Sequence, residues 1–489
     1  MTLERKGGLV VVANRLPVSI RQGPDGRATI RPSDGGLVAA LTPALNHAGG
    51  TWIGWPGTGH STPALLAELA AEGTRAGYTL EPVFLTAEEQ QGFYAGFSNE
   101  VIWPLFHDLL ARCNFAPAYW DAYEAVTDRY AERVAAVAEG ADLVWVHDYH
   151  LIRLGERVRD LGVTAPLAFF LHIPFPAPDM FLRLPWRDQI LRAFLAFDLV
   201  GFQTPRDRRN FLDCLRQFLP AVTLSGRGQP VVRALHEGRE VRIGRFPIGV
   251  DFRDLATRSS APGVVGRARG LRNLLPDRQL LLGVDRLDYT KGIPERLEAF
   301  ADALTRYPEL RERVTLIQVP SRDDLPEYAS LKQRIENLVG EINGRFTHPG
   351  GWVPIHYLYR RLEAGELLAY YRAADVALVT PLKDGMNLVA KEYCACSRSG
   401  VLVLSEFAGV AAEMHHAALL VNPHAVRDVA DAIQQACTMR PADRQRRMRA
   451  LRRQVRRHDV YWWLDSFLRA AIMRDLSAFP QPPDHLHAG

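Results

Sequence analysis

The sequence lacks any long hydrophobic run. Its 489 residues contain no apolar stretch near the ~18 residues that a membrane-spanning helix needs. The first fifteen residues, MTLERKGGLVVVANR, also lack an apolar core of the length found in secretory signals. We therefore expect a cytoplasmic protein with no membrane partner.

Cysteine is scarce, and its number is odd. A disulfide framework would need an even set at close spacings, and a zinc site would need paired Cys or His residues. The pair in Cys394-x-Cys396 falls on a predicted helix, where it reads as packing. Neither disulfides nor a zinc site is expected from the five cysteines, which are Cys113, Cys214, Cys394, Cys396 and Cys437.

Three motifs of nucleotide-binding proteins are also missing. No Asp is followed two residues later by another Asp, so the metal-holding pair of many nucleotide-sugar transferases is absent. No Gly-x-x-x-x-Gly-Lys-Ser/Thr loop occurs, and no Gly-x-Gly-x-x-Gly follows the first predicted strand. These absences argue against an ATPase and a conventional dinucleotide site. Cationic side chains and helix N-terminal amides would then meet the charge of any diphosphate, so we expect no metal and no cofactor.

The charge balance is only mildly basic. A net charge of +4, with 23% charged residues, suits small phosphorylated ligands but is too weak to indicate nucleic acid. One segment, residues 440–459, is dense in arginine. Met448, Leu451 and Val455 recur in it at helical spacing, which predicts a surface helix with its arginines on the solvent side. No nucleic-acid partner is expected.

What the sequence does contain is a series of short apolar runs without alternation. Such runs are typical of strands buried on both faces of a parallel sheet. Helical patterns lie between them, for example at 186–197 and 327–342, and alternation of strand and helix predicts a doubly wound α/β architecture. The runs are 9–15, 143–150, 167–174, 199–204, 280–286, 314–322, 376–384 and 401–406.

The chain is too long for one core. The segment RFPIGVD, residues 245–251, separates the predicted strands into two sets. We expect two Rossmann-like domains of doubly wound parallel sheets facing each other across a cleft, at 1–246 and 247–455. Residues 456–489 would form a C-terminal helix that packs back on the first domain.

Polar residues are concentrated at the ends of the predicted strands. Ligands of open α/β sheets bind beyond the carboxyl ends of the strands, so these residues are candidates for a site. Each alone could be structural, and their concentration is the signal. They are Arg15, Asp148, His172, Arg286, Arg322 and Asp384.

Two stretches of the second half suit a diphosphate sugar. In GVDRLDYTKG, Arg286 offers a planar fork of donors and Lys291 a compact charge, although a surface salt bridge is the plain alternative. In PLKDGMNLVAKEY, Asp384 has the character of an N-cap and Gly385 lets a ligand approach the main chain. An ordinary capped helix explains the second stretch equally well.

The first half offers weaker signals. The Gly-Gly loop in PSDGGLVAAL could present amides to phosphate or be a tight turn. HDYHL and FLHIPFP place Asp148 and His172 at neighbouring strand ends, where a lone histidine is more often satisfied by a carbonyl than catalytic. Tyr94 and Trp103 belong either to the core or to the wall of a sugar pocket.

Taken in order, these motifs resemble the trehalose-6-phosphate synthase family of retaining GT-B glycosyltransferases. The resemblance covers about residues 8 to 470 and includes NRLP, GGL, WIGWPG, FSNEVIWPLFH, HDYHL, FLHIPFP, DRLDYTKG, PLKDGMNLVAKEY and VLSEFAG. It implies transfer of glucose from a nucleotide diphosphate-glucose, UDP-glucose foremost, to glucose 6-phosphate with retention. It also implies front-face attack, in which the leaving phosphate takes the acceptor's proton.

The resemblance assigns roles to individual residues. His172 would lie beside the transferred sugar, and Arg286 and Lys291 would hold the donor diphosphate. The other donor contacts would be Gly36, Asp384, Gly385, Met386, Asn387, Leu388, Val389 and Glu392. The acceptor contacts would be Arg15, Tyr94 and Arg322 at the phosphate, and Trp55, Trp103 and Asp148 at the sugar.

Alternatives remain at this stage. A glucosylglycerol-phosphate synthase would keep the reaction and change the acceptor, whereas a nucleotide-sugar epimerase would need no phosphate grip in the first half. A non-catalytic regulatory homologue would have little need of a full donor site. The sequence leaves the base of the donor open, and it is compatible with a homodimer or a homotetramer.

Overall fold

The chain forms two α/β units. The computed structural model describes residues 8–22, 28–32, 36–226, 228–321, 328–349 and 351–472. Unit 1 comprises Met1–Pro247 and Trp463–Gly489, and unit 2 comprises Ile248–Trp462. The chain therefore leaves unit 1 once and returns to it near its C-terminus.

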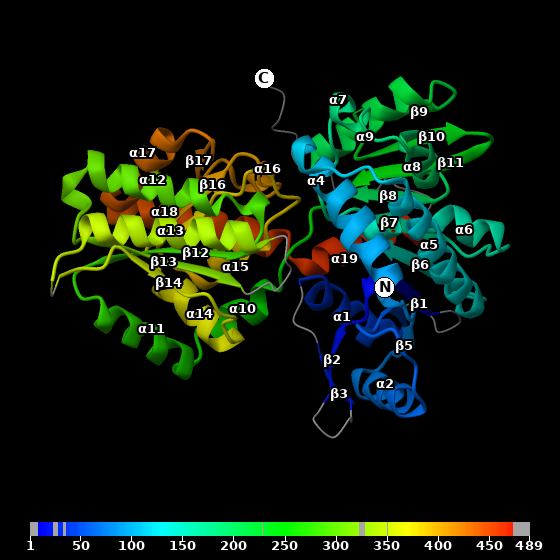
Figure 1. Ribbon diagram of the computed structural model, residues 1–489, viewed down its shortest axis with the longest axis horizontal. Coiled ribbons are helices and arrows are strands. Elements are labelled where there is room, and N and C mark those ends of the chain that lie inside the picture. Colours follow the sequence, from blue (N-terminus) through cyan, green and yellow to red (C-terminus); the bar gives the residue numbers. More distant parts are fainter. Residues whose placement is uncertain are drawn as a thin grey trace. The chain divides into compact units, whose positions relative to one another are not determined.

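Unit 1 is built on a nine-stranded sheet within the described residues (Figure 1). Strands β5 to β11 of this order are parallel, whereas β10 is antiparallel to β11 and β9. The prediction of a parallel sheet was thus wrong for this edge, because short turns connect these strands and allow antiparallel pairing. The spatial order is β5 (Thr79–Pro82), β4 (Gly50–Trp55), β1 (Leu9–Arg15), β6 (Leu143–His147), β7 (Leu167–Phe170), β8 (Leu199–Phe202), β11 (Arg239–Arg245), β10 (Val231–His236) and β9 (Thr223–Ser225).

Helices connect the strands of unit 1, and a hairpin of β2 (Val18–Gln22) and β3 (Ala28–Pro32) follows β1. The segment η1 is π-helical over Gln90–Ile102, a form that is rare at this length. The remaining helices are α1 (Gly36–Ala48), α2 (Pro63–Ala76), α3 (Ala87–Glu89), α4 (Trp103–Phe106), η2 (Leu110–Arg112), α5 (Pro117–Val137), η3 (Tyr149–Leu151), α6 (Leu154–Asp160), α7 (Pro178–Phe181), α8 (Arg187–Phe194) and α9 (Pro205–Phe218).

Unit 2 contains a six-stranded sheet that is parallel throughout its described strands. The order is β14 (Ile355–Tyr357), β13 (Val314–Ser321), β12 (Gln279–Arg286), β15 (Val376–Val379), β16 (Val401–Ser405) and β17 (Leu419–Val421). Its helices are α10 (Phe252–Ser259), α11 (Pro262–Leu274), η4 (Tyr289–Lys291), α12 (Ile293–Arg306), η5 (Pro308–Leu310), α13 (Ala329–Phe346), α14 (Ala364–Ala373), α15 (Leu388–Cys396), α16 (Ala411–Met414), α17 (Val426–Thr438) and α18 (Pro441–Arg457).

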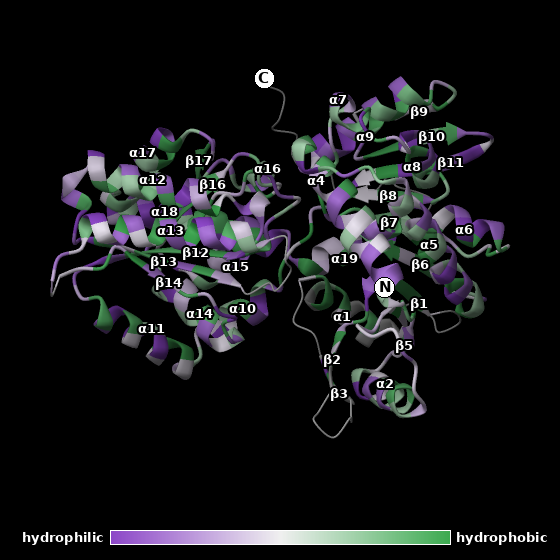
Figure 2. Cartoon of the chain, viewed as in Figure 1, coloured by the Kyte–Doolittle hydropathy of each residue, from purple (hydrophilic) through white to green (hydrophobic). Residues whose placement is uncertain are grey.

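The central strands are buried along their whole length. Every residue of β6, β7, β8, β15 and β16 is buried, which explains why these runs are apolar without alternation. In Figure 2 the sheets are largely green, and many helices change from green to purple around their circumference. All eight predicted strands are present, and the α/β class with two Rossmann-like units is confirmed.

The arginine-rich helix α18 differs from its prediction. Met448, Leu451 and Val455 are buried as expected. Several arginines, however, do not face solvent: Arg447 donates to Ala417 O at 3.1 Å, and Arg452 donates to three carbonyls at the end of α15. These long side chains reach across the helix surface to carbonyls at the ends of neighbouring elements, where cations are stabilising.

The last helix, α19 (Val460–Ile472), supplies unit 1 with apolar side chains from Trp463 onward. Trp463 packs on Trp145 with ring centroids 5.2 Å apart, and Phe467 stacks on Trp145 at 4.4 Å. Phe467 also meets Phe170 at 5.6 Å. The C-terminal segment of the described chain is therefore part of the core of unit 1.

No helix among the described residues is long and apolar enough to cross a membrane. All five cysteines are unpaired, and four of them are buried. Burial raises the pKa of the partly buried Cys113 thiol to about 11, so it is protonated near neutrality. The expectation of no disulfides is confirmed.

Candidate active site

A cationic and aromatic cluster lies at the carboxyl end of β1 in unit 1. The parallel pairing of β1 with β4 places Arg15 opposite Trp55. The guanidinium carbon of Arg15 lies 4.7 Å from the ring centroid of Trp55 and 5.5 Å from that of Tyr94. Arg15 is exposed, so two aromatic faces hold its cationic head at the surface without neutralising it. Such a group is suited to binding a phosphate.

His150 packs against this cluster through Tyr94 and was not identified from the sequence. Its ring stacks on Tyr94, with centroids 5.7 Å apart and planes inclined by 8°. Burial, together with the charge of Arg15, lowers the pKa of His150 to about 3, so the ring is neutral. A neutral ring avoids adding a second positive charge beneath Arg15. The signal was available, since His150 is the second histidine of HDYHL, but its function depends on contacts with η1, far away in sequence.

Asp148 and His172 meet at the ends of β6 and β7. The Asp148 carboxylate accepts the backbone N–H of His172 at 3.1 Å. Asp148 itself has φ 72° and ψ 169°, a strained conformation for a residue with a side chain. The backbone of the turn after β6 is therefore strained at Asp148. Such strain is common at residues that contact ligands.

His172 shares a hydrogen bond with a second histidine. Its Nε2 lies 3.1 Å from Nδ1 of His147, so one ring donates and the other accepts. Burial lowers the pKa of His172 to about 3, and burial with the neighbouring His172 lowers that of His147. The pair is therefore neutral at physiological pH. His172 is only partly buried, and a neutral ring there can bond a sugar hydroxyl without attracting the diphosphate.

Three further predicted residues, two in unit 1 and one in unit 2, have less defined surroundings. Trp103, half-buried, packs on Tyr149 at 5.7 Å and on His107 at 4.2 Å. Gly36 is the exposed first residue of α1, but residues 33–35 of its loop lie outside the described residues. Arg322 also lies outside them, directly after β13.

In unit 2, the end of β12 presents two cations. Arg286 is exposed, and its Nη2 donates to Asp288 at 3.1 Å. Asp288 is buried and also accepts the N–H and hydroxyl of Thr290, each at 2.9 Å, which fixes the short helix η4. Lys291 closes that helix, and its ammonium lies 2.7 Å from the Asp384 carboxylate. The surface salt-bridge alternative is therefore excluded for Lys291, which is buried.

Asp384 links the two donor-like stretches of the sequence. It lies past the end of β15, and its carboxylate binds both the Lys291 ammonium and the side-chain amide of Asn387 at 3.1 Å. Its main chain is bonded on both sides to the loop after β16, through Phe407 O at 3.2 Å and Gly409 N at 3.1 Å. The structure thus brings together residues ninety positions apart in one small charged cluster.

Asp384 is not the N-cap of the following helix, so that prediction was wrong. Helix α15 begins at Leu388, and Asn387 caps it: its side chain accepts the N–H of Ala390 at 3.2 Å. Asn387 has φ 75°, a conformation that Asn tolerates better than most residues. Gly385 and Met386 are buried beside it, and the half-buried Leu388 and Val389 carry the first helical amides. A helix N-terminus is favourable for an anion.

Glu392 lies one turn into α15. Its carboxylate accepts the hydroxyl of Tyr371 at 2.8 Å. Burial raises the pKa of Glu392, and the Tyr371 hydrogen bond offsets part of that rise. A partly buried carboxylate with one donor bound still has acceptor capacity for a vicinal diol such as a ribose.

Arg296 holds this cluster in place and was missed in the sequence. It is buried on α12 and forms an ion pair with Asp285, one residue before Arg286. It also donates to Thr380 Oγ1 at 2.9 Å, just past β15, and to Lys291 O at 3.3 Å. One side chain therefore links the end of β12, which carries the two cations, to the end of β15, which leads to Asp384. In the sequence it is an unmarked arginine in a helical pattern.

No group of three or more His, Cys, Asp or Glu side chains in the described ranges is arranged to hold a metal ion. The charged groups near the end of β12 include Arg286 and Lys291, with Asp288 and Asp384 as their counter-ions, and the buried Arg296–Asp285 pair. A negatively charged ligand would find donors here in the side chains and in the amides of α15.

Comparisons with known proteins agree with this picture. A trehalose-6-phosphate synthase from Mycobacterium sp. strain JLS is 45% identical over 471 residues, covering 94% of this chain and 95% of the relative. An α,α-trehalose-phosphate synthase (UDP-forming) from Burkholderia xenovorans, solved with glucose-6-phosphate, has a TM-score of 0.84 at 35% identity, covering 95% of this chain and 99% of that one. An E. coli structure bound with UDP-2-fluoro glucose also scores 0.84, at 34% identity, covering 96% and 99%.

Two Rossmann-like units with polar residues at the carboxyl ends of their strands, and these neighbours, define a glycosyltransferase of the GT-B type. The model of glycosyltransferase family 20 matches residues 7–472. The chain belongs to glycosyltransferase family 20, the family of the trehalose-6-phosphate synthases.

Proposed function

We propose that the protein transfers glucose from UDP-glucose to glucose 6-phosphate, with retention, to give α,α-trehalose 6-phosphate and UDP. In this proposal unit 1 binds the acceptor and unit 2 the donor. The observation that carries it is the cluster in which Lys291, Asp384 and Asn387 converge beside Arg286 at the end of β12. The relatives solved with glucose-6-phosphate and with UDP-2-fluoro glucose support this choice of substrates.

On the donor side, Arg286 and Lys291 would bind the diphosphate. The exposed fork of Arg286 matches two phosphate oxygens, and Lys291 adds a charge whose position Asp384 fixes. Gly36 of unit 1 would approach the same phosphates. The carboxylate of Asp384 and the main chain from Gly385 to Val389 would bind glucose and phosphate oxygens, and Glu392 the ribose.

On the acceptor side, Arg15 would bind the 6-phosphate. Trp55 and Tyr94 lie against its guanidinium, and the residue stays exposed to a ligand. Arg322 would add a second guanidinium, and Trp103 and Asp148 would contact the sugar. An epimerase needs no such phosphate grip, and the exposed charge of Arg15 therefore supports a transferase.

We assign no residue as a nucleophile. The acceptor hydroxyl would attack from the face that the diphosphate leaves, and a leaving phosphate oxygen would take its proton, so the configuration is retained. The protein then contributes positioning and charge stabilisation, which are large terms in catalysis. The neutral His172 would bond a hydroxyl of the transferred glucose, and the cations near β12 would stabilise the departing charge without a metal.

The proposal is tested by product analysis. The purified protein is incubated with glucose 6-phosphate and, separately, with UDP-, ADP- and GDP-glucose, each with and without EDTA. Mass spectrometry and NMR are expected to identify α,α-trehalose 6-phosphate, at an undiminished rate in EDTA. Formation of glucosylglycerol phosphate from glycerol 3-phosphate in its place, or nucleotide release that ignores the acceptor, would refute the assignment. Both substrates are charged metabolites, which suits the cytoplasmic location predicted from the sequence.

A further inference from the structure

A cavity of unit 1 lies at the amino-terminal ends of its strands β7, β8 and β11. It has a volume of about 710 Å³, within the range of small-molecule sites. Its walls come from the segments that precede β7 and β8, from the start of β11, and from the ends of α6 and α19. Arg15, Asp148 and His172 lie instead at the carboxyl ends of their strands. The cavity is therefore separate from the candidate active site.

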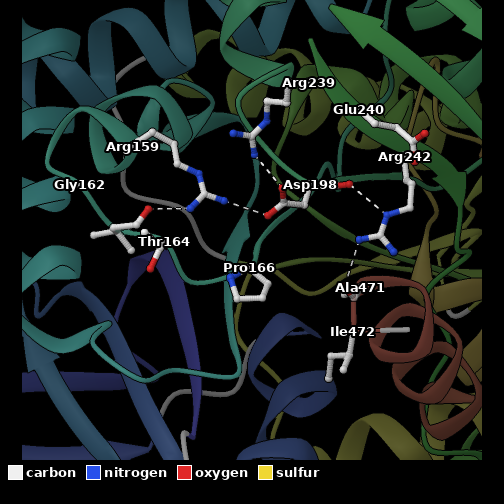
Figure 3. A pocket seen from close by; sticks show the side chains of 11 residues that line it. Arg159, Gly162, Thr164, Pro166, Asp198, Arg239, Glu240, Arg242, Ala471 and Ile472 are labelled. Carbon is white, nitrogen blue, oxygen red and sulfur yellow. Dashed lines mark hydrogen bonds and ion pairs between the residues drawn. The ribbon is translucent and has the colours of Figure 1, made fainter. Parts of the chain in front are cut away.

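Three guanidinium groups and two carboxylates, Asp198 and Glu240, line this cavity (Figure 3). Arg239 donates to one oxygen of Asp198 at 2.7 Å, and Arg159 donates to the other at 2.9 Å. The second oxygen also accepts the N–H of Leu167 at 2.8 Å, so Asp198 is tied to the start of β7. Glu240, the other carboxylate, lies 3.7 Å from Arg233, and Arg242 donates to the main-chain oxygen of Asp198 at 3.3 Å. The three guanidinium groups of the lining therefore outnumber its two carboxylates.

The three guanidinium groups differ in how many hydrogen-bond acceptors each one contacts. Arg242 donates to Ala470 O and Ala471 O, at the C-terminal end of α19, where the helix dipole favours a cation. Arg159 donates hydrogen bonds to Val163 O and Ala165 O. Arg239 makes one hydrogen bond, to Asp198, and its Nε is buried without a partner among the described residues.

Arg159 shows the same unused capacity. Its Nε is also buried without a hydrogen-bond partner in the described part of the chain. Burial lowers the pKa of Arg159, the Asp198 carboxylate offsets part of that effect, and the like charge of Arg239 adds to it. Buried donors without acceptors cost free energy. An oxyanion between the two side chains would accept hydrogen bonds from them and would reduce the repulsion between the two guanidinium charges.

We propose that this cavity is a second ligand site, in which Arg239 and Arg159 bind a small oxyanion carried by a phosphate monoester or a carboxylate. Thr164 contributes a hydroxyl to the wall of the site, and the fork of Arg239 provides the main contact. The proposal stands whether or not the reaction proposed above is correct.

The test is calorimetric titration of the full-length protein with inorganic phosphate and, separately, with malonate. Arg239→Gln removes the principal cation, and Thr164→Trp fills the cavity without changing its charge. Each is expected to weaken one binding event at least tenfold, as the loss of a charge-assisted contact requires. Arg216→Gln is the matched control, since Arg216 pairs with Asp213 on α9 away from the cavity.

The Arg15→Ala variant distinguishes phosphate binding in the cavity from phosphate binding at Arg15. This variant should still show the binding that Arg239→Gln weakens. An effect with phosphate alone identifies a phosphate site, and an effect with malonate alone or with both identifies a carboxylate-tolerant site. The proposal is overturned if neither anion gives a saturable event, or if Arg239→Gln and Thr164→Trp bind both anions as the wild type does. Circular dichroism of each variant verifies that it is folded.

Discussion

Lys291 shows how a single charge becomes useful by being fixed. Its ammonium is buried next to Asp384, and its carbonyl is held by Arg296. An ammonium on a free four-carbon chain would lose side-chain entropy on binding a diphosphate. Here folding has already removed that freedom, so the charge meets the leaving group at little further cost.

Replacement of Lys291 or Arg286 by Ala is therefore expected to lower kcat/KM on the order of 10²-fold, because each removes a preorganised donor to the leaving diphosphate. Steady-state kinetics with UDP-glucose measure the effect. Arg306→Ala is the control, since Arg306 lies in the last turn of α12 and pairs with Asp302 and Asp431. A loss equal to that of the control would remove both residues from the donor site.

Arg15 provides the corresponding test on unit 1. Arg15→Ala should raise the KM for glucose 6-phosphate at least tenfold and leave the KM for the donor nearly unchanged, because the guanidinium is assigned to the acceptor phosphate alone. Full kinetics with both substrates varied separate the two constants. Equal effects on the two KM values would contradict the assignment.

Backbone strain also occurs at residue scale in both units. Asp148 and Asn387 have φ values of 72° and 75°, and both belong to the candidate site. Sequence indicated the residue types and motifs but not these conformations. Left-handed Asp and Asn occur in many turns, so only coordinates distinguish a strained functional residue from a plain turn.

At the scale of elements, α18 holds the C-terminal end of α15 through Arg452, a contact called the clamp below. Arg452 donates to Cys394 O at 3.0 Å, Ala395 O at 2.5 Å and Ser397 O at 2.8 Å, and its guanidinium lies over the ring of Phe252 at 5.1 Å. These carbonyls end α15, the helix whose first turn belongs to the candidate donor site. A cation at a helix C-terminus satisfies carbonyls that have no partner within the helix.

Arg452→Ala is expected to destabilise the protein by about 2 kcal/mol, the cost of leaving such carbonyls unpaired. Thermal unfolding followed by circular dichroism measures the change. Arg456→Ala, an exposed position on the same helix, should change stability by less than ~0.5 kcal/mol. Similar shifts for both variants would mean that the clamp contributes nothing.

The same elements show what the sequence could predict. Strands buried on both faces, such as β6 and β15, carry their signal locally and were found. Strands β10 and β11 were missed because one face of β10 is exposed and polar residues interrupt its apolar pattern. The start of α15 was misplaced because Asp384 and Asn387 are both good caps, and the choice is made by Lys291, a contact across ninety residues.

At the scale of the whole molecule, both units contain an aspartate that precedes one central strand and accepts a backbone N–H of the neighbouring strand. Asp198 precedes β8, and its carboxylate accepts the N–H of Leu167 at 2.8 Å. Asp375 precedes β15 and likewise accepts the N–H of Leu280 at 2.9 Å. In each unit an arginine binds the same carboxylate. An amide at the start of a central strand, the first of β7 and the second of β12, is thus satisfied in the same way in both Rossmann-like sheets.

The two units should respond differently to acid. In unit 1, His147, His150 and His172 have pKa values lowered by burial, so below pH ~6.5 the unfolded state takes up protons that the folded state does not. Stability then falls as the pH decreases from about 6.5 toward 3. In unit 2, burial also lowers the pKa values of His356 and His416, but both side chains are exposed. Burial alone would raise the pKa of Glu413, but Lys391 and His458 lower it to about 2. Its contribution is complete above pH ~4.5 and is lost as the pH falls toward 2.

Hydrogen exchange between pH 7.5 and 4, corrected for the intrinsic pH dependence, should therefore show protection lost in unit 1 before unit 2. Each histidine contributes up to about 1.4 kcal/mol per pH unit. His150→Phe removes one titrating group and should reduce the pH dependence of unit 1 without changing that of unit 2. Earlier loss of protection in unit 2 would contradict this order.

The return of the chain to unit 1 has a consequence for biosynthesis. Trp145 and Phe170 are covered by Trp463 and Phe467, which the ribosome adds only after all of unit 2. At roughly 5–20 residues per second, the nascent first half spends tens of seconds with aromatic side chains uncovered. Unit 2, whose chain is continuous, has no such wait. The part of the protein made first is therefore the last to be completed, and it is the part that most needs chaperone protection during translation.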